Sequence, residues 1–175
     1  LLLGNKPYDV TSLFTKLTGN ITLPPKWAFG PWMSANTWNN QSKTEEVVKR
    51  TLHEDIPATV LVLEAWSDES TFYIFNDAHY TAKHGSEKLS LEDFRFTGRW
   101  PNPKAMIDYC HQNGIRVLLW QIPVHKKLDE PHAQHDADGK YLLEQNFAIQ
   151  NEDGTPYHNK GWWFTHAFIP DFTNP

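Results

Sequence analysis

The sequence predicts an α/β fold in which parallel strands alternate with helices. Two nearly continuous apolar runs, TVLVLEAW at 59–66 and IRVLLWQIP at 115–123, are typical of strands buried on both faces. A helical segment precedes each run, and a shorter aromatic strand candidate precedes the first helix. This order of strand, helix, strand, helix and strand indicates right-handed βαβ units on a parallel sheet.

The first strand and helix come early in the chain. The strand candidate is WAFGPWM at 27–33, a compact aromatic segment that polar residues follow. We predict the helix over 45–55, EEVVKRTLHED, and Pro57 ends it. Ser42 and Glu45 lie three positions apart, so they fit a capping box at the helix start.

The second helix is predicted over 103–113, PKAMIDYCHQN. Asn102 opens it, and Gly114 is the residue type favoured just past a helix end. Cys110 lies within this pattern, so a packed thiol is a better interpretation than a nucleophile. It is the only cysteine, which excludes an internal disulfide.

Two irregular stretches follow the strands. About 35 polar and aromatic residues after the second strand are too many for a simple loop, and FYIF at 72–75 is the best strand candidate within them. After the third strand we predict a small β-rich insertion over 124–167, with Asp153-Gly154 as a hairpin turn. AFIPDF at 167–172 is then expected to return to the sheet as a fourth strand.

These expectations divide the chain into four parts. Residues 1–23 are weakly patterned and precede a proline pair, so we interpret them as a linker or the tail of a preceding domain. The other parts are three β/α units over 24–123, the insertion over 124–167, and the return to the sheet over 168–175.

Charge and composition exclude several classes of partner. The net charge is −5 and no long Lys/Arg run is present, so neither nucleic acid nor an anionic membrane is expected to bind. No apolar run approaches the roughly 20 residues of a membrane span, and the start of the chain lacks the pattern of a signal peptide. The absence of such segments favours a cytoplasmic location.

Cofactor and metal motifs are also missing from the sequence. It contains no G-x-G-x-x-G and no Walker loop, so no nucleotide cofactor is expected. His132 and His135 lie three apart and could chelate a metal, but a solvated loop is the better interpretation of that charged stretch. We therefore predict neither a cofactor nor a metal.

Carboxylates, amides and aromatic rings near the strand ends remain as candidates. Polar segments follow each strand, namely SANTW, SDES and VHKK, and parallel sheets place their sites at that edge. Glu64 interrupts an apolar strand near its end, where a carboxylate is costly unless it meets a polar cavity or a partner. A structural acid paired with an arginine or with backbone N–H groups is the alternative.

Tryptophan is abundant, with eight residues in a chain that is 14% aromatic. Trp32, Trp66 and Trp120 each lie at or near the end of a predicted strand and could line one pocket. Sugars have apolar C–H faces that suit aromatic rings, and hydroxyls that suit carboxylates and amides. The combination of these residue types therefore indicates a carbohydrate partner.

An ordered set of segments resembles glycoside hydrolase family 31: PPKWAFGPW, DIPATVLVLEAW, DFRFTGRWPNPKAMIDYCHQNGIRVLLWQIP, DGTPYHNKGWW and PDFTNP. The resemblance covers 24–175. It implies the N-terminal portion of a (β/α)8 TIM barrel with a small β-rich insertion after the third strand. It also implies an enzyme that hydrolyses α-linked glycosides with retention, such as an α-glucosidase or α-xylosidase. An α-transglycosylase and a non-catalytic carbohydrate-binding module are the alternatives.

The resemblance also implies roles for single residues. Glu64 takes the first acidic position of the family's D-I-D motif, which binds sugar hydroxyls, whereas Trp66 stands at the second, a departure that points to a different sugar or linkage. Trp120 matches an aromatic residue at the end of the third strand, and Trp162 and Trp163 match an aromatic pair of the insertion.

The family's two catalytic carboxylates have no counterpart in these residues, so we expect no catalytic residue here and an inactive chain. Part of a barrel also has unpaired sheet edges, so we expect oligomerisation or swapping to stabilise it.

Overall fold

The structure is a computed structural model that describes residues 1–161 and 164–174. It divides into two compact units, Leu1–Gly30 and a second unit that starts at Pro31. The first unit contains two helical elements, α1 (Pro7–Thr18) and the short 3-10 helix η1 (Lys26–Phe29). Neither helix was predicted from the sequence, and η1 occupies part of the segment that was expected to be the first strand.

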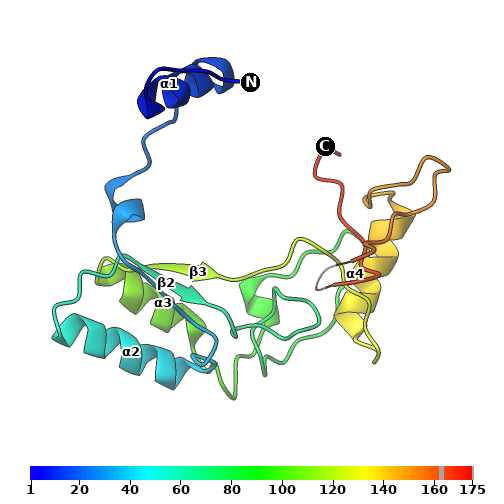
Figure 1. The fold of residues 1–175 in the computed structure, drawn as a ribbon. Helices are drawn as coiled ribbons and strands as arrows, with labels where there is room; N and C mark the ends of the chain where they lie inside the picture. The colour runs from blue at the N-terminus through cyan, green and yellow to red at the C-terminus, as the bar shows by residue number, and fades with distance from the viewer. Residues whose placement is uncertain (162–163, 175) are drawn as a thin grey trace. The chain divides into compact units, whose positions relative to one another are not determined.

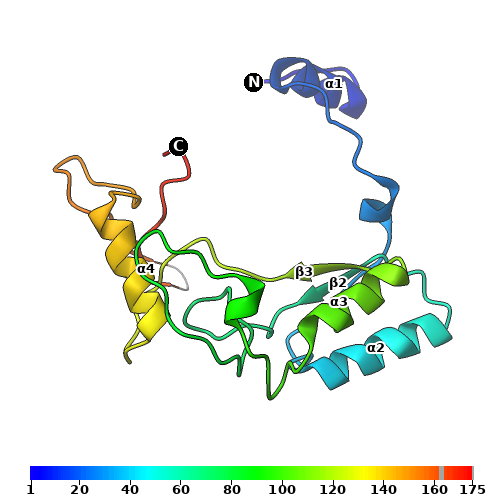
Figure 2. The same ribbon diagram turned by 180° about the vertical axis from the view of Figure 1, so that it is seen from behind.

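The second unit is built on a parallel three-stranded sheet with the order β1-β2-β3. Its strands are β1 (Trp32–Ala35), β2 (Val60–Leu63) and β3 (Arg116–Leu119). The connecting helices α2 (Gln41–His53) and α3 (Pro103–Gln112) lie on the same face of the sheet (Figures 1 and 2). The predicted βαβ order is therefore confirmed, with a first strand that starts later than expected.

The hydrophobic core lies between the sheet and these two helices. Leu61 and Leu63 of β2 are fully buried, and they belong to one cluster with Val48 of α2 and with Met106 and Cys110 of α3. Burial raises the pKa of the Cys110 thiol to about 11, so this thiol stays protonated near neutral pH. The predicted packed thiol is confirmed.

The opposite face of the sheet is more open. Side chains alternate across a strand, so the residues between the core positions point to this face. They include Trp32 and Ser34 of β1, Val62 of β2 and Leu118 of β3, all of which are more exposed than their core-facing neighbours on β2. In a closed α/β barrel, this face would line the interior.

The helix caps were predicted with mixed success. The side chain of Asn102 accepts a hydrogen bond from the backbone N–H of Ala105 at 3.1 Å, and Gly114 adopts φ +76°, so both predicted ends of α3 are confirmed. For α2 the predicted capping box was wrong. Its N-cap is Asn40, whose side chain accepts from the Lys43 N–H at 2.8 Å.

Residues 67–101, hereafter the excursion, join β2 to α3. The strand predicted at 72–75 was wrong, because the described contacts there amount to one antiparallel bridge between Ser67 and Phe75. The excursion contains one 3-10 turn, η2 (Leu91–Asp93), and is otherwise irregular.

The insertion, residues 124–167, differs from its predicted β-rich character because it contains the helix α4 (Ala133–Glu144). His132 is the N-cap of this helix, so the prediction of a solvated loop at His132 and His135 was also wrong. The turn at Asp153-Gly154 is confirmed, since the Asn151 N–H donates to the Thr155 carbonyl at 2.8 Å across it.

The predicted fourth strand was wrong for the part of the chain that the structure describes. Residues 167–172 pair with the insertion and its start instead of with β3. Phe168 bridges to His125 and His158, and Pro170 bridges to Ala148.

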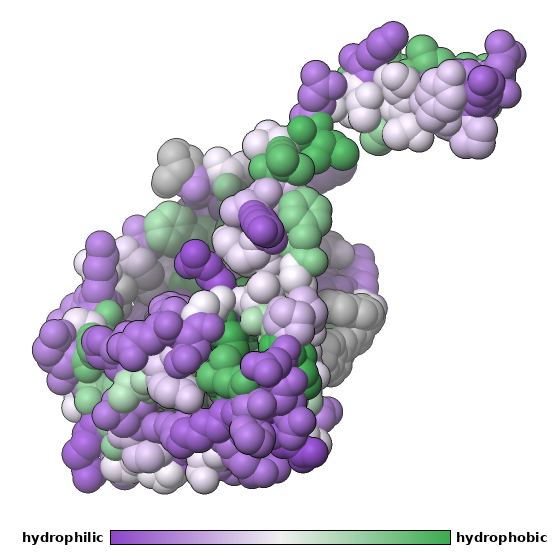
Figure 3. All heavy atoms as spheres, turned by 90° about the vertical axis from the view of Figure 1, so that its left-hand side faces the viewer, coloured by the Kyte–Doolittle hydropathy of each residue, from purple (hydrophilic) through white to green (hydrophobic). Residues whose placement is uncertain are grey.

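Figure 3 views the molecule from the side where the strands begin. Polar side chains cover most of the lower part of this view. Large apolar residues exposed near the strand starts include Trp32 and Ile56. Within the described residues, no helix combines the length and apolar character required to cross a bilayer.

Candidate functional site

An open cavity of about 1070 Å³ lies at the edge of the sheet where the strands end. Its lining comes from the segments after all three strands and from the end of the insertion. The main polar and aromatic contributors are Asn36, Asn39, Glu64, Glu69, Phe72, Asn76, Arg99, Trp120, Lys126, Lys127, Asp129 and His166. The predicted gathering of polar segments beyond the strands is therefore confirmed.

Glu64 directly follows β2 and enters this cavity. Leu61 and Leu63 point into the core, so the alternation of side chains directs Glu64 to the open face of the sheet. The hydroxyl of Ser34 on β1 donates a short hydrogen bond to Oε1 of Glu64. A carboxylate has about four acceptor positions, so Glu64 retains capacity for further hydrogen-bond donors.

Trp120 and Trp66 lie at the same end of the sheet but in different layers. Trp120 lines the cavity, and its ring and that of Phe72 pack edge-to-face, with ring centroids 5.7 Å apart. Trp66 is only 2% exposed, and its indole N–H donates to the backbone carbonyl of Trp120 at 2.7 Å. Trp66 does not line the cavity; it supports the backbone that carries Trp120.

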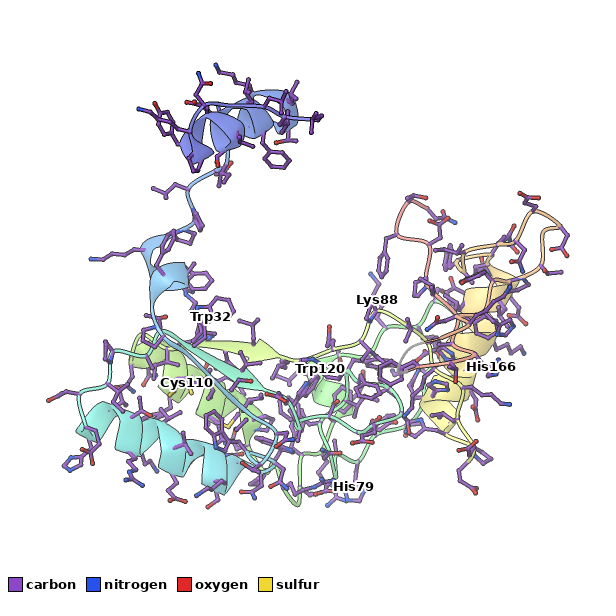
Figure 4. The ribbon with its side chains drawn as sticks, in the orientation of Figure 1. Trp32, His79, Lys88, Cys110, Trp120 and His166 are labelled. Carbon is purple, nitrogen blue, oxygen red and sulfur yellow. The ribbon has the colours of Figure 1, made fainter. Side chains whose placement is uncertain are left out.

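Trp32 occupies a different place. It is the first residue of β1 and pairs with Val60, the first residue of β2. Glu64 is four residues beyond Val60, so about 13 Å of strand separates the two levels at roughly 3.3 Å per residue. Figure 4 shows Trp32 at the far end of the sheet from Trp120, with His166 on the insertion side. Trp162 and Trp163 lie outside the described residues.

Several lining residues were not singled out from the sequence. Phe72, Asn76 and Arg99 belong to the excursion, whose irregular backbone has no periodic pattern to fix the direction of a side chain. The one available signal was the position of the excursion directly after a strand end.

The insertion has its own buried polar cluster. The rings of His125 and His135 stack with centroids 3.7 Å apart, and burial, together with the nearby His125, lowers the pKa of His135 to about 4. Gly139 of α4 makes room for this pair, since a Cβ there would lie 2.6 Å from Cε1 of His125. One turn from His135, burial raises the pKa of Asp138 to about 6.

Asp138 also joins the insertion to the excursion. Tyr73 of the excursion donates a short hydrogen bond to Oδ2 of Asp138, and the side chain of Gln134 donates to Oδ1 at 2.8 Å. Gln134 pairs in turn with the backbone N–H and carbonyl of Lys83, at 2.9 and 3.2 Å. Across residues 1–161 and 164–174, no group of three or more His, Cys, Asp or Glu side chains could hold a metal ion.

The fold defines the general class of protein. A parallel sheet with helices on one face and its polar side chains beyond the strand ends is the arrangement of α/β-barrel enzymes. Residues 21–175 match the model of the glycosyl hydrolases family 31 TIM-barrel domain, and the chain belongs to this family. The structure and this match agree with the N-terminal part of a TIM barrel, as the resemblance implied.

The chain is 47% identical to the isomaltosyltransferase of Sporosarcina globispora, over 98% of this chain and 16% of that protein. It is 39% identical to the 1,3-alpha-isomaltosidase of Kribbella flavida, over 95% of this chain and 23% of that protein. Among solved structures it resembles the cycloalternan-forming enzyme of Listeria monocytogenes in complex with a pentasaccharide substrate. That likeness has a TM-score of 0.90 and 43% identity over 98% of this chain and 16% of the other. The chain thus spans about a quarter or less of these relatives.

Proposed function

We propose that the protein containing this chain is a retaining α-glycosidase or α-transglycosylase that acts on isomaltosyl groups, which are pairs of α-1,6-linked glucose units. The observation that carries the proposal is the likeness to two relatives whose names both refer to an isomaltosyl unit, at 47% and 39% identity. Both alignments cover nearly the whole chain, including the end of β2 with its Glu64-Ala65-Trp66 sequence.

The cavity supports an oligosaccharide ligand. Its volume of about 1070 Å³ lies just above the roughly 300–1000 Å³ of typical small-molecule pockets. Glu64 offers a carboxylate for hydroxyl groups, and Trp120 and Phe72 offer apolar ring surface for sugar C–H faces. Asn36 and Asn76 add amides that both donate and accept hydrogen bonds.

The residues of this chain bind and orient the sugar in the proposed mechanism. Retaining hydrolysis requires a nucleophilic carboxylate and an acid/base carboxyl about 5–5.5 Å apart. The resemblance assigns both to barrel strands that the 175 residues do not include, so Glu64 acts as a hydrogen-bond acceptor for the bound sugar. Ser34 fixes the Glu64 carboxylate by its hydrogen bond from the neighbouring strand.

The test is product analysis with the full-length protein. We expect release of isomaltose, or its transfer to an acceptor oligosaccharide, from p-nitrophenyl α-isomaltoside. The isolated chain should show no turnover, because loss of a nucleophile generally costs several orders of magnitude in rate. Turnover of p-nitrophenyl α-glucoside or α-xyloside without action on the isomaltoside would contradict the proposal. Turnover by the isolated chain would contradict the assignment of catalysis to other segments.

Two alternatives have distinct outcomes in the same experiment. Formation of longer oligosaccharides identifies a transglycosylase, and free isomaltose alone identifies a hydrolase. Sugar binding by the full-length protein without any turnover would identify a non-catalytic binding module.

The sheet has two outer strands, β1 and β3, so sedimentation of the isolated chain should detect association through these edges.

A further inference from the structure

Arg99 is held at the cavity by an unusually complete set of contacts to one carboxylate. Its Nε and Nη2 donate to Oδ2 and Oδ1 of Asp77, each at 3.0 Å, and its backbone N–H donates to Oδ2 at 2.9 Å. A bidentate pair fixes both the position and the plane of a guanidinium group. The hydrogen bonds from Arg99 lower the pKa of Asp77, so the carboxylate stays ionised near neutral pH.

The backbone around this pair is shaped to hold it. Asp77 adopts φ +64° and Gly98 adopts φ +58°, a region that favours glycine and is uncommon for aspartate. A Cβ at Gly98 would overlap the carboxylate of Asp77. The hydroxyl of Thr97 also donates to the backbone carbonyl of Asp77 at 2.6 Å. Residues 97–99, near the end of the excursion, therefore meet its earlier part at Asp77.

An exposed ion pair adds little stability on its own. The side chains of Arg99 and Asp77 are 46% and 38% exposed, which places this pair in the exposed class. Left-handed backbone at aspartate opposes folding, so stability alone is a weak reason for the arrangement. The pair instead presents a guanidinium group in a fixed orientation at the cavity.

Asp77 uses two of the five guanidinium N–H donors of Arg99, so three others are not engaged by this carboxylate. Arg99 lines the same cavity as Glu64. Glu64 is partly buried at the strand end, whereas Arg99 is more exposed and lies on the rim. Arg99 can therefore contact a part of the ligand that lies nearer to solvent than the part that Glu64 contacts.

We propose that Arg99 binds hydroxyl oxygens of the second glucose unit of an isomaltosyl group, and that Asp77 is the positioning residue that orients Arg99. This inference rests on the proposed function and deepens it, because it assigns the preference for a disaccharide over a single sugar to the rim of the cavity. Asp77 contacts no substrate and acts through the plane and the charge of the guanidinium group.

The test compares isomaltose with glucose as ligands of the full-length protein by isothermal titration calorimetry, with p-nitrophenyl α-isomaltoside kinetics alongside. For Arg99→Ala we expect isomaltose to bind roughly 10- to 100-fold more weakly, the range for a lost hydrogen bond to a charged group. Glucose affinity should change less than about two-fold. Lys104→Ala is the matched control, since it removes an exposed ion pair with Asp108 on the adjacent helix α3.

Two further variants separate binding from folding. Arg99→Lys keeps the charge but loses the planar guanidinium group. It should therefore weaken the binding of isomaltose by a smaller factor than Arg99→Ala does, and raise KM with little change in kcat. Asp77→Asn removes the charged acceptor and should act in the same direction as Arg99→Lys. If Arg99→Ala lowers the melting temperature strongly, Arg99→Lys provides the comparison.

The outcomes distinguish the two proposals. If the wild-type protein binds isomaltose no better than glucose, the proposed function fails, and this inference fails with it. If the wild type prefers isomaltose and the Arg99 variants keep the same preference, only this inference is overturned. An equal loss of affinity for both sugars would also overturn this inference, because it would show that the Asp77–Arg99 pair only maintains the shape of the cavity.

Discussion

One buried and one partly buried group on α4, His135 and Asp138, are expected to respond to acid in opposite directions. Burial lowers the pKa of His135 from 6.5 to about 4 and raises that of Asp138 from 3.8 to about 6. The two residues lie one helical turn apart. The ring of His125 stacks on His135, and the side chains of Tyr73 and Gln134 donate to Asp138. The charges of Asp136 and His132 on the same segment also act on the pKa of His135, Asp136 raising it and His132 lowering it.

The direction in which His135 changes the stability of the insertion with pH follows from proton binding. Between pH 6.5 and about 4, the unfolded segment binds a proton at His135 that the folded segment does not. Acidification through this range therefore destabilises the folded insertion. The difference between the two pKa values corresponds to at most about 3 kcal/mol, at 1.36 kcal/mol for each pKa unit.

The effect of Asp138 on the pH dependence of stability has the opposite sign. Between pH 6 and 3.8, the folded segment holds a proton that the unfolded segment has lost, so acidification stabilises the folded insertion. The corresponding limit is again about 3 kcal/mol, which solvent screening lowers because Asp138 is only partly buried. The wild-type insertion should consequently show little net change in stability from pH 6 to pH 4.

Hydrogen exchange of the α4 amides, measured by mass spectrometry on the full-length protein and corrected for the intrinsic exchange rate, tests this cancellation. We expect protection in His135→Leu to rise as the pH falls from 6.5 to 4, and protection in Asp138→Asn to fall. His84→Leu, at an exposed histidine of the excursion, is the control and should behave as the wild type does. The same pH slope in wild type, His135→Leu and Asp138→Asn would refute the reasoning.

Further predictions concern stability, each measured by denaturant unfolding. Leu61→Ala should cost about 2–5 kcal/mol, because Leu61 is fully buried in the core; a loss below about 1 kcal/mol would contradict that placement. Leu118→Ala should cost less than about 1 kcal/mol in the isolated chain, where Leu118 is 39% exposed, but about 2–5 kcal/mol in the full-length protein if this face lines a barrel. Asn102→Ala should cost about 1 kcal/mol through loss of the α3 cap, and an unchanged midpoint would contradict the capping role.

The sheet was predictable from the sequence because its strands are nearly continuous apolar runs. Residues 59–66 and 115–123 contain β2 and β3, and Asn102 and Gly114 mark the ends of α3 with side-chain and backbone chemistry that is local. Such signals depend on neighbours in the chain, so a single sequence carries them.

The start of α2 shows where local signals compete. Ser42 with Glu45 matched a capping box, but Asn40 also fits an N-cap, and it is the one whose side chain accepts from Lys43. Starting the helix at Gln41 also lets the Gln41 side chain accept from the backbone N–H of Asn102, at 2.8 Å. This contact joins residues 61 positions apart, so no local pattern could reveal it.

The helix α4 was missed because its buried face is polar. Gln134, His135 and Gly139 are buried there in place of the usual aliphatic residues, so the segment has no apolar stripe at helical spacing. Its partners lie in the excursion, about 50 residues earlier, and only the folded structure shows that Gln134 meets Lys83.

For the site, the positions of Glu64 and Trp120 could be predicted from the sequence because each residue directly follows an apolar strand. Trp32 was misplaced relative to the strand because the preceding residues form η1, which moves β1 so that it begins at Trp32. The contact of Glu64 and Trp120 with a sugar is a prediction.

The pairing of Gln134 with Lys83, together with the Tyr73–Asp138 hydrogen bond, has a consequence for protein engineering. Transplanting the insertion of one family member into another would break these contacts unless the excursion came with it. Suitable recombination points for functional chimeras therefore lie in β1 or β2, so that the excursion and the insertion come from the same parent. Recombination within β3 or within α4 would combine an excursion and an insertion from different parents and would put these contacts at risk.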